Sequence, residues 1–370
     1  MSLPPKSSGH TRLIALDAFR GFTIAAMIMV NYPGSWSHVY SPLLHVEWHG
    51  ITPTDLIFPF FIFIVGVSIV LAYNKRLEAG LPKSDMYRKI IIRGIKIFAV
   101  GIFLALYPTF DFESLRVAGV LQRIAIVFTV CALLYLNSGW KAQAWAAAAI
   151  LIFYWLSMSL IPVPGVGKAT LEPGVNLAAW IDQQILPGRM WQGTWDPEGF
   201  YSTIPAIVTG ITGMLTGRLI VSAKSRELAI LWLFSLGFLA ALSGEMWGWV
   251  FPINKNIWTS SYVLYTSGLA AMTLAVAMFF IDMLGYRRGT KFGIIYGANA
   301  ITAYVLAGVL RVVFYRWPVA GHSLNQHFVG GLSGTGLDPK LASLMYALMY
   351  VFIVFIPVYF LYRKKIFIKL

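Results

Sequence analysis

The sequence predicts an all-α integral membrane protein that crosses the bilayer about ten times, with both termini on the cytoplasmic side. Hydrophobic residues make up 58% of the 370 positions and charged residues only 12%, about half the charged fraction that covers a soluble domain. The apolar residues are gathered into runs of about 18–24, the length that a helix needs to cross roughly 30 Å of hydrocarbon. The ten-residue alternation of a transmembrane β-barrel does not occur.

Ten segments fit this description, and residues typical of helix starts precede several of them. Thr52-Pro53-Thr54-Asp55 marks the second segment, Ser202-Thr203 the sixth and Asp338-Pro339 the tenth. We interpret the first segment as a retained helix, because no small-residue cleavage site follows it. The ten predicted spans cover residues 13–30, 54–73, 90–107, 117–137, 143–161, 202–221, 227–243, 260–283, 292–314 and 341–362.

The orientation follows from the distribution of basic residues. Most of the 29 lysines and arginines fall on one side of the ten spans, in short loops and in the tail Arg363-Lys364-Lys365, and this side is expected to be cytoplasmic. The basic residues separate apolar runs and form no stripe, so the net charge of +14 predicts no nucleic-acid partner. We expect a single transmembrane domain over 1–370, with a cytoplasmic segment at 1–12 and a basic tail at 363–370.

The loops on the opposite side are long and carry most of the polar chemistry. All but one of the six histidines lie there, the exception being His10. An aromatic belt at the membrane surface accounts for some of the tryptophans and tyrosines, but it does not require histidines, carboxylates and amides. Function is therefore predicted at the outer half of the bundle, in the loops 31–53, 108–116, 162–201, 244–259 and 315–340.

An acid and a base stand together near the inner end of the first span. Asp17 and Arg20 are three residues apart, so they share one face of the helix and can form an ion pair. Two interpretations are open: a pair that stabilises the fold, or an Arg20 that meets a phosphate group.

A polar cluster surrounds the first outer loop. Asn31 ends the first span, and His45 and His49 precede Asp55 at the start of the second. A histidine is the natural general base near neutral pH, and an asparagine can orient a substrate or stabilise an oxyanion. The alternative is a loop with structural histidines only. The histidine spacings match no metalloprotease pattern, so we expect no metal.

Two further polar stretches lie at the outer ends of later spans. Gln122 and Arg123 open the fourth span, where a buried arginine needs a partner, either a substrate or nearby Asp111 or Glu113. The stretch 252–261, preceded by Glu245, combines amides, a lysine and a tryptophan, as polar-ligand sites do. Its alternative role is to cap the eighth span. Its candidate residues are Asn254, Lys255, Asn256 and Trp258.

Taken in order, these stretches resemble the family of heparan-α-glucosaminide N-acetyltransferase and its bacterial relatives. The most specific piece is the run His45 to Phe61, HVEWHGITPTDLIFPFF. The matching stretches span nearly the whole chain: Leu16–Gly21, Val30–Tyr32, Gly119–Arg123, Trp195–Gly199, Pro252–Ser261 and Asn299 within Tyr296–Ala300. Where the family has Trp-Asn-Gly, this chain has Trp48-His49-Gly50.

The resemblance implies transfer of acetyl from cytosolic acetyl-CoA to the amino group of a glucosamine-type sugar on the outer face. It carries the active histidine to His45 and the supporting asparagine to Asn31. It further implies a multi-pass protein of a bacterial cytoplasmic membrane and a homodimer, and the shorter chain makes heparan sulfate itself an unexpected acceptor. We expect Arg20 and Asp17 on the acetyl-CoA side and an acceptor pocket formed by Asp55, Trp48, His49, Gln122, Arg123, Glu245, Asn254, Lys255, Asn256, Trp258 and Asn299.

Two mechanisms and one rival function remain open at this point. His45 either removes a proton from the acceptor amine or carries the acetyl group as a covalent intermediate. Either course needs a passage through the bundle that lets a thioester reach His45 from the cytoplasmic side. The rival is a polytopic transporter for a sugar or another small polar molecule, which would carry charged residues and broken helices at the bilayer centre.

Overall fold

The computed structural model describes residues 13–368, and it confirms an all-α polytopic membrane protein. Within these residues, β-structure is limited to a hairpin of β1 (Pro318–Val319) and β2 (His322–Ser323) and one bridge between Arg116 and Gly188. The α-helices are α1 Ile14–Asn31, α2 Ile57–Glu78, α3 Lys83–Leu106, α4 Val120–Asn137, α5 Trp140–Leu160, α6 Leu177–Ile185, α7 Phe200–Ser222, α8 Arg226–Gly248, α9 Ser260–Ala277, α10 Thr290–Ala298, α11 Ala300–Tyr315, α12 Leu324–Gly334 and α13 Pro339–Arg363. Short 3-10 turns η1 (Ser41–Leu43) and η2 (Pro53–Leu56) precede α2, and a π-helical turn η3 (Met278–Met283) extends α9.

Each of the ten predicted spans corresponds to helix in this structure, but not every one of these helices is long and apolar enough to cross a membrane. Over residues 13–368, eight helices are long and apolar enough to cross a membrane, or nine if a bent pair counts as one span. The helix that falls short is α3, in which Lys89, Arg93 and Lys96 occupy every stretch of 18 residues. The first two turns of α3 carry charged residues, which favours an end that reaches beyond the apolar layer.

The prediction of one continuous helix over 292–314 is wrong. The chain bends by 81° between α10 and α11, and Asn299 at the break has a non-helical backbone. Its carboxamide donates to the carbonyl of Ile366 at 3.1 Å and accepts from the amide of Ile368 at 2.9 Å. A short amide side chain that bonds backbone groups competes with helical hydrogen bonds. Here the Asn299 side chain bonds the backbone of the C-terminal segment.

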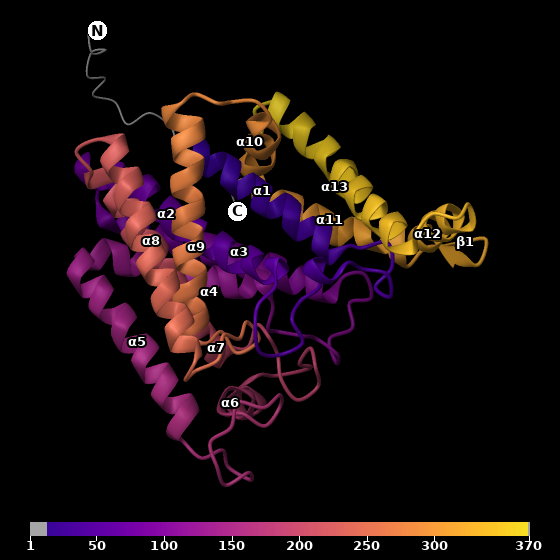
Figure 1. Cartoon of the computed structure of the whole chain (residues 1–370), viewed down its shortest axis with the longest axis horizontal. Coiled ribbons are helices and arrows are strands. Elements are labelled where there is room, and N and C mark those ends of the chain that lie inside the picture. The colour runs from indigo at the N-terminus through magenta and orange to yellow at the C-terminus, as the bar shows by residue number, and fades with distance from the viewer. Residues whose placement is uncertain (1–12, 369–370) are drawn as a thin grey trace.

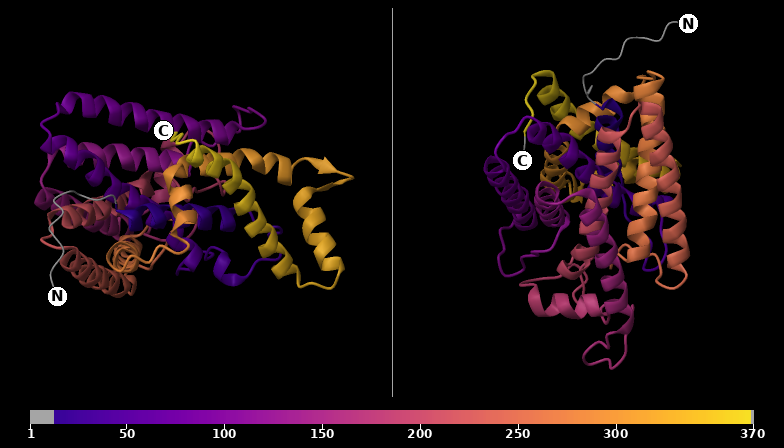
Figure 2. Two further views of the ribbon diagram at one scale, coloured as in Figure 1. Left: turned by 90° about the horizontal axis from the view of Figure 1, so that it is seen from above. Right: turned by 90° about the vertical axis from the view of Figure 1, so that its left-hand side faces the viewer.

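Close helix contacts hold the bundle together. Figure 1 shows α8 and α9 packed side by side, and the left view of Figure 2 shows α3 running along α4. At the tightest crossings glycines let the backbones touch: Gly21 of α1 faces Gly293 and Gly297 of α10, and Gly66 of α2 faces Gly210 of α7. Small residues at such contacts are typical of membrane helices, where association depends on close packing.

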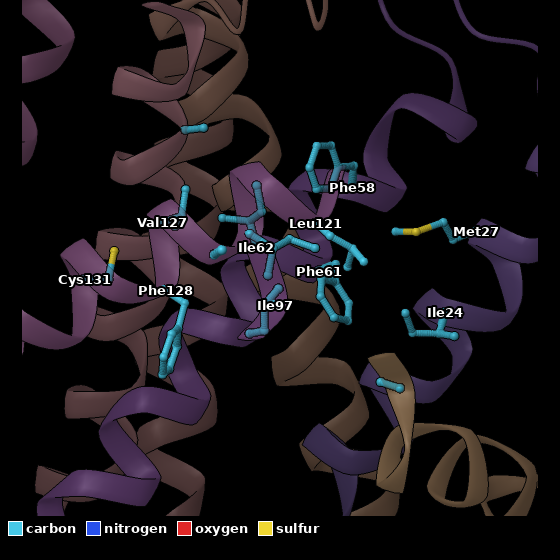
Figure 3. Close-up of a cluster of buried hydrophobic side chains, with 14 of the residues drawn as sticks. Ile24, Met27, Phe58, Phe61, Ile62, Ile97, Leu121, Val127, Phe128 and Cys131 are labelled. Atoms are coloured by element: carbon cyan, nitrogen blue, oxygen red, sulfur yellow. The ribbon is translucent and has the colours of Figure 1, made fainter. Parts of the chain in front are cut away.

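The largest buried cluster extends over most of the bundle and includes residues of α1, α2, α3 and α4. Figure 3 shows Ile24 and Met27 of α1 pointing toward Phe58, Phe61 and Ile62 of α2. Ile97 of α3 and Leu121 of α4 belong to the same cluster. This packing fixes the start of α2, and therefore the loop before it, against the rest of the bundle.

Two ends of the bundle differ in character. We call the end that carries segments 32–56, 107–119, 161–199 and 249–259 the loop face, and the end with the short turns 79–82, 138–139 and 223–225 the basic face. The long segments of the loop face contact one another, as Gly50 with Ile253 and Arg189 with Leu115. The short helix α6 lies among these segments (Figure 1).

Substituting Gly66 tests the α2–α7 crossing. A Cβ atom at Gly66 would lie 2.1 Å from the carbonyl oxygen of Gly210, so the two helices must separate. We expect Gly66→Ala to destabilise the protein by about 1–3 kcal/mol, the usual cost of overpacking. Thermal unfolding in detergent, followed by tryptophan fluorescence, measures the change. Gly331→Ala in α12 is the control, because a Cβ atom there meets nothing within 4 Å; equal midpoints for the two variants would contradict the crossing.

Candidate functional site

The first loop of the loop face is built around the buried carboxylate of Asp55. Thr52 and Asp55 form a capping box at η2. One carboxylate oxygen accepts from the amide of Thr52 at 3.0 Å, from its hydroxyl at 2.9 Å and from the amide of Val46 at 3.1 Å. These bonds draw residues 44–52 back onto the start of α2, and an ionised carboxylate favours such a set of donors.

The other oxygen of Asp55 orients His45. The distance from His45 Nδ1 to Asp55 Oδ1 is 2.6 Å, and the carboxylate is fully buried whereas the His45 side chain is 44% exposed. An ionised carboxylate only accepts hydrogen bonds. It therefore selects the imidazole tautomer with the proton on Nδ1, in which the lone pair on Nε2 is the hydrogen-bond acceptor of the ring.

Lys255 completes this group from the far end of the sequence. Its Nζ lies 3.0 Å from His45 Nδ1, 3.2 Å from His45 Nε2 and 3.7 Å from Asp55 Oδ1. Burial lowers the pKa of Lys255, although the negative charge of Asp55 acts in the opposite direction. The sequence placed Asp55 and Lys255 in the acceptor pocket; the structure brings both into contact with His45.

The loop that carries Lys255 docks onto the loop that carries His45. The Asn254 side chain lies 3.2 Å from His49 Nδ1, and Asn256 reaches the carbonyl of Glu47 at 3.4 Å. Burial lowers the pKa of His49, which favours its neutral form. Asn254, Lys255 and Asn256 thus all contact the loop that carries His45, and Lys255 contacts the His45 ring itself.

Trp48 connects the same loop to segment 161–199. Its indole nitrogen donates to the carbonyl of Leu171 at 2.9 Å, and its ring packs edge-on against Trp195 at 5.0 Å. Trp48 is therefore held by contacts on both sides. Its indole N–H is paired within the chain.

Arg123 and Trp258 are core residues beneath the site. Both are buried, and the guanidinium of Arg123 stacks over the Trp258 ring at 4.9 Å. Arg123 forms neither of the ion pairs considered from the sequence, with Asp111 or Glu113. It instead donates to oxygens at the start of α7: the carbonyl of Gly199 and the hydroxyls of Ser202 and Thr203.

An ion-pair network that the sequence analysis missed lies next to this core. Arg116 donates two hydrogen bonds to Asp196, at 2.7 and 2.6 Å, and one to Glu198 at 2.5 Å. Burial by itself lowers the pKa of Arg116, but the two carboxylates outweigh it and raise the pKa. The sequence did offer a signal for these ion pairs, because it has an arginine in one outer loop and two carboxylates in another.

Two further candidates lie at the loop-face ends of other helices. Asn31 ends α1 partly exposed, and its side chain makes no hydrogen bond to residues 13–368. Gln122 is buried at the start of α4 and packs against Gly101 and Gly119.

The remaining candidates lie elsewhere. Glu245 is exposed near the end of α8, and Asn299 holds the C-terminal segment at the α10–α11 break. Asp17 and Arg20 form their expected pair at 3.5 Å. Arg20 also donates to the hydroxyl of Ser68 and the carbonyl of Gly297, so the structure places this pair in a helix contact.

Two cavities approach this region. An apolar groove of about 390 Å³ lies between α1, α2 and α9, lined from Ala18 and Ile281 to Pro53 and Leu56. A polar cavity of about 490 Å³ lies between α3, α4 and α11 under the loop face. His45 lines neither of them. Within residues 13–368 no group of three or more His, Cys, Asp or Glu residues is placed to hold a metal ion.

Fold and site together define a polytopic membrane protein with a histidine, a carboxylate and a lysine gathered at one end of its helices. Residues 12–245 match the model of the catalytic part of heparan-α-glucosaminide N-acetyltransferase. The chain belongs to this family. Two relatives with this name are 28% identical in Mus musculus, over 99% of this chain, and 30% identical in Homo sapiens, over 100%. The chain spans about 60% of the length of these relatives.

The start of α7 gives a test by pH. Asp182 of α6 accepts from the amide of Tyr201 at 3.0 Å, and burial raises its pKa from 3.8 to about 6. A raised folded-state pKa means that the stability contributed by this group is fully present below about pH 4 and is lost as pH rises through 6. Asp182→Asn should not lose stability in this way, because the asparagine side chain does not titrate.

We therefore expect the unfolding midpoint of Asp182→Asn, relative to wild type, to rise between pH 4 and pH 7. Thermal unfolding at matched ionic strength measures it. Asp85→Asn, at an exposed position of α3, is the control and should show no such rise. Parallel profiles for the wild type and Asp182→Asn would argue against a buried, proton-binding carboxyl at this position.

Proposed function

We propose that this protein transfers an acetyl group from acetyl-CoA to the amino group of a glucosamine-type sugar. The acceptor is bound at the loop face, which we take as the outer side of a bacterial cytoplasmic membrane. Family membership supports acetyl transfer, and the relatives' name supports an amino sugar. The observation that carries the proposal for this chain is the 2.6 Å contact between His45 and the buried Asp55.

The reaction requires a base at the acceptor, because an amine attacks a thioester only when it is unprotonated. Asp55 holds the proton on His45 Nδ1 and leaves Nε2 to accept a proton from the amine. The imidazolium that forms is stabilised by the carboxylate behind it, in the manner of other histidine–carboxylate pairs. The exposed edge of His45 is open to a substrate from the loop face.

The atoms balance in a single displacement. Acetyl-CoA supplies the acyl group as a thioester. The amine nitrogen adds to the acetyl carbon to give a tetrahedral intermediate, and His45 takes the amine proton. Collapse of the intermediate breaks the carbon–sulfur bond, and His45 passes the proton to the departing sulfur. Lys255, 3.2 Å from Nε2, is placed to stabilise the oxyanion of the tetrahedral intermediate. Asn31 is proposed to orient the imidazole or the thioester carbonyl.

The apolar groove between α1, α2 and α9 supports a route for the donor from the basic face. Ala18 and Ala26 of its lining are eight residues apart on α1, about 12 Å along a helix. Its other end is lined by Pro53 and Leu56, which flank Asp55. We propose that the slender pantetheine arm follows this groove, with the nucleotide near Arg20 and Asp17. A homodimer remains an expectation from the family.

Replacing His45 tests the function directly. His45→Ala should lower acetyl transfer by at least about 100-fold, because general base catalysis contributes on that scale, while the unfolding midpoint stays within a few degrees of wild type. The assay is transfer of radiolabelled acetyl from acetyl-CoA to glucosamine-type acceptors by the purified protein in vesicles. His38→Ala is the control, since the His38 ring hydrogen-bonds only Ser35 among the described residues.

The same assay separates the two chemical courses. Labelled acetyl found on the wild-type protein without acceptor, and missing from His45→Ala, would establish a covalent acetyl-histidine step. A folded His45→Ala variant with full transfer activity would refute both courses.

Asn31 gives a second test. Its side chain has no partner among residues 13–368, so Asn31→Ala should leave the fold and acetyl-CoA binding unchanged. Turnover should fall by about 100-fold if the amide donates to the oxyanion. Steady-state kinetics and acetyl-CoA binding by calorimetry measure the two effects, with Asn137→Ala at the basic face as control. Loss of acetyl-CoA binding in Asn31→Ala would mean that the amide serves the donor site instead.

A further inference from the structure

The polar cavity under the loop face has an unusual lining. Its walls come from α3, α4 and α11, which Figure 1 labels, and its volume is about 490 Å³. Four arginines line it: Arg116 and Arg189 from two outer segments, and Arg311 and Arg316 from α11 and its end. No aspartate or glutamate is among its lining residues. Arg189, Arg311 and Arg316 are exposed, so the mouth of the cavity is strongly positive.

Only one of these arginines is compensated within the described part of the chain. Arg116 is paired with Asp196 and Glu198. Arg189, Arg311 and Arg316 have no carboxylate within 4 Å and make no side-chain hydrogen bond to residues 13–368. Three unpaired guanidinium groups around one cavity repel one another, and a bound anion removes that repulsion.

The number and geometry of the free guanidinium groups indicate the kind of anion. Each presents a planar fork of N–H donors that matches oxygens in pairs. A carboxylate has two oxygens and one charge, which one fork satisfies. A phosphate monoester has three terminal oxygens and close to two charges, which suits three forks. We infer that this cavity binds a phosphate group.

The neighbours of the cavity indicate where that phosphate comes from. Tyr32, next to Asn31, lines the cavity, as does Gln122. Trp191 lines it as well, with Arg116 stacked 4.9 Å from its ring, and an indole face is a good surface for a sugar ring. This step rests on the proposed function: the phosphate belongs to the acceptor, which is a phosphorylated amino sugar that places its amine toward His45.

The binding test needs no catalysis. In detergent at constant ionic strength, inorganic phosphate should raise the unfolding midpoint of the wild-type protein and of His45→Ala alike. The double variant Arg189→Gln/Arg311→Gln should bind phosphate about tenfold more weakly or worse, because each charged hydrogen bond contributes on that scale. Lys168→Gln, at an exposed position outside the cavity, should respond like the wild type. Equal responses of the double variant and the wild type would overturn the anion site.

Three further experiments decide where the phosphate comes from. Glucosamine 6-phosphate should be acetylated with a KM about tenfold lower than glucosamine, and the double variant should lose this difference while its kcat for glucosamine stays within twofold. Stabilisation by phosphatidylglycerol nanodiscs alone would assign the cavity to a lipid headgroup. Competition of phosphate with acetyl-CoA, abolished in the double variant, would assign it to the donor. Either of the last two results would overturn the acceptor assignment. A wild-type protein that binds phosphate but acetylates no amino sugar would refute the proposed function and leave the anion site unaffected.

Discussion

The buried carboxylate of Asp55 is the interaction on which the rest of the site depends. Taking a charge out of water costs several kcal/mol unless donors and an opposite charge replace the solvent. Here the donors are the backbone of Val46 and Thr52, the hydroxyl of Thr52 and the ring of His45. Its hydrogen bond to Asp55 fixes each of these donors in place. The charge therefore organises the loop, and the loop presents the imidazole.

The position of Asp55 depends in turn on the helix bundle. The hydroxyl of Tyr262 in α9 donates to the main-chain carbonyl of Asp55 at 2.6 Å, and the Tyr262 ring packs against Trp258. Trp258 supports the guanidinium of Arg123, which bonds the start of α7. The site thus rests on α2, α4, α7 and α9 together, and it can be no more precise than their packing. That packing is set where glycines bring backbones into contact.

Charge at the loop face is arranged in two different ways. Around His45 the charges are compensated, because Lys255 lies against Asp55. In the neighbouring cavity the guanidinium groups of Arg189, Arg311 and Arg316 have no carboxylate partner among residues 13–368. Compensated charges hold a structure, whereas uncompensated ones are available to a ligand. This contrast separates the part of the loop face that positions His45 from the part that we propose binds the acceptor.

The sequence alone was enough for the membrane class and the approximate positions of the helices, because hydrocarbon thickness imposes a length on every apolar run. It also singled out His45, since its motif is contiguous and its chemistry belongs to a single side chain. The sequence did not predict the bend at Asn299, because the hydropathy of α10 and α11 is continuous. The break depends on a contact with a C-terminal segment 67 residues away.

Only the tertiary structure decided which residues surround His45. Asp55 is ten residues away and Lys255 is 210 residues away, and no local pattern distinguishes a lysine that touches an imidazole from one that caps a helix. The same holds for Arg116 with Asp196, and for the arginines that share the cavity. The physical reason is that hydropathy acts on each segment separately, whereas an ion pair exists only when packing has brought two distant segments within a few ångströms.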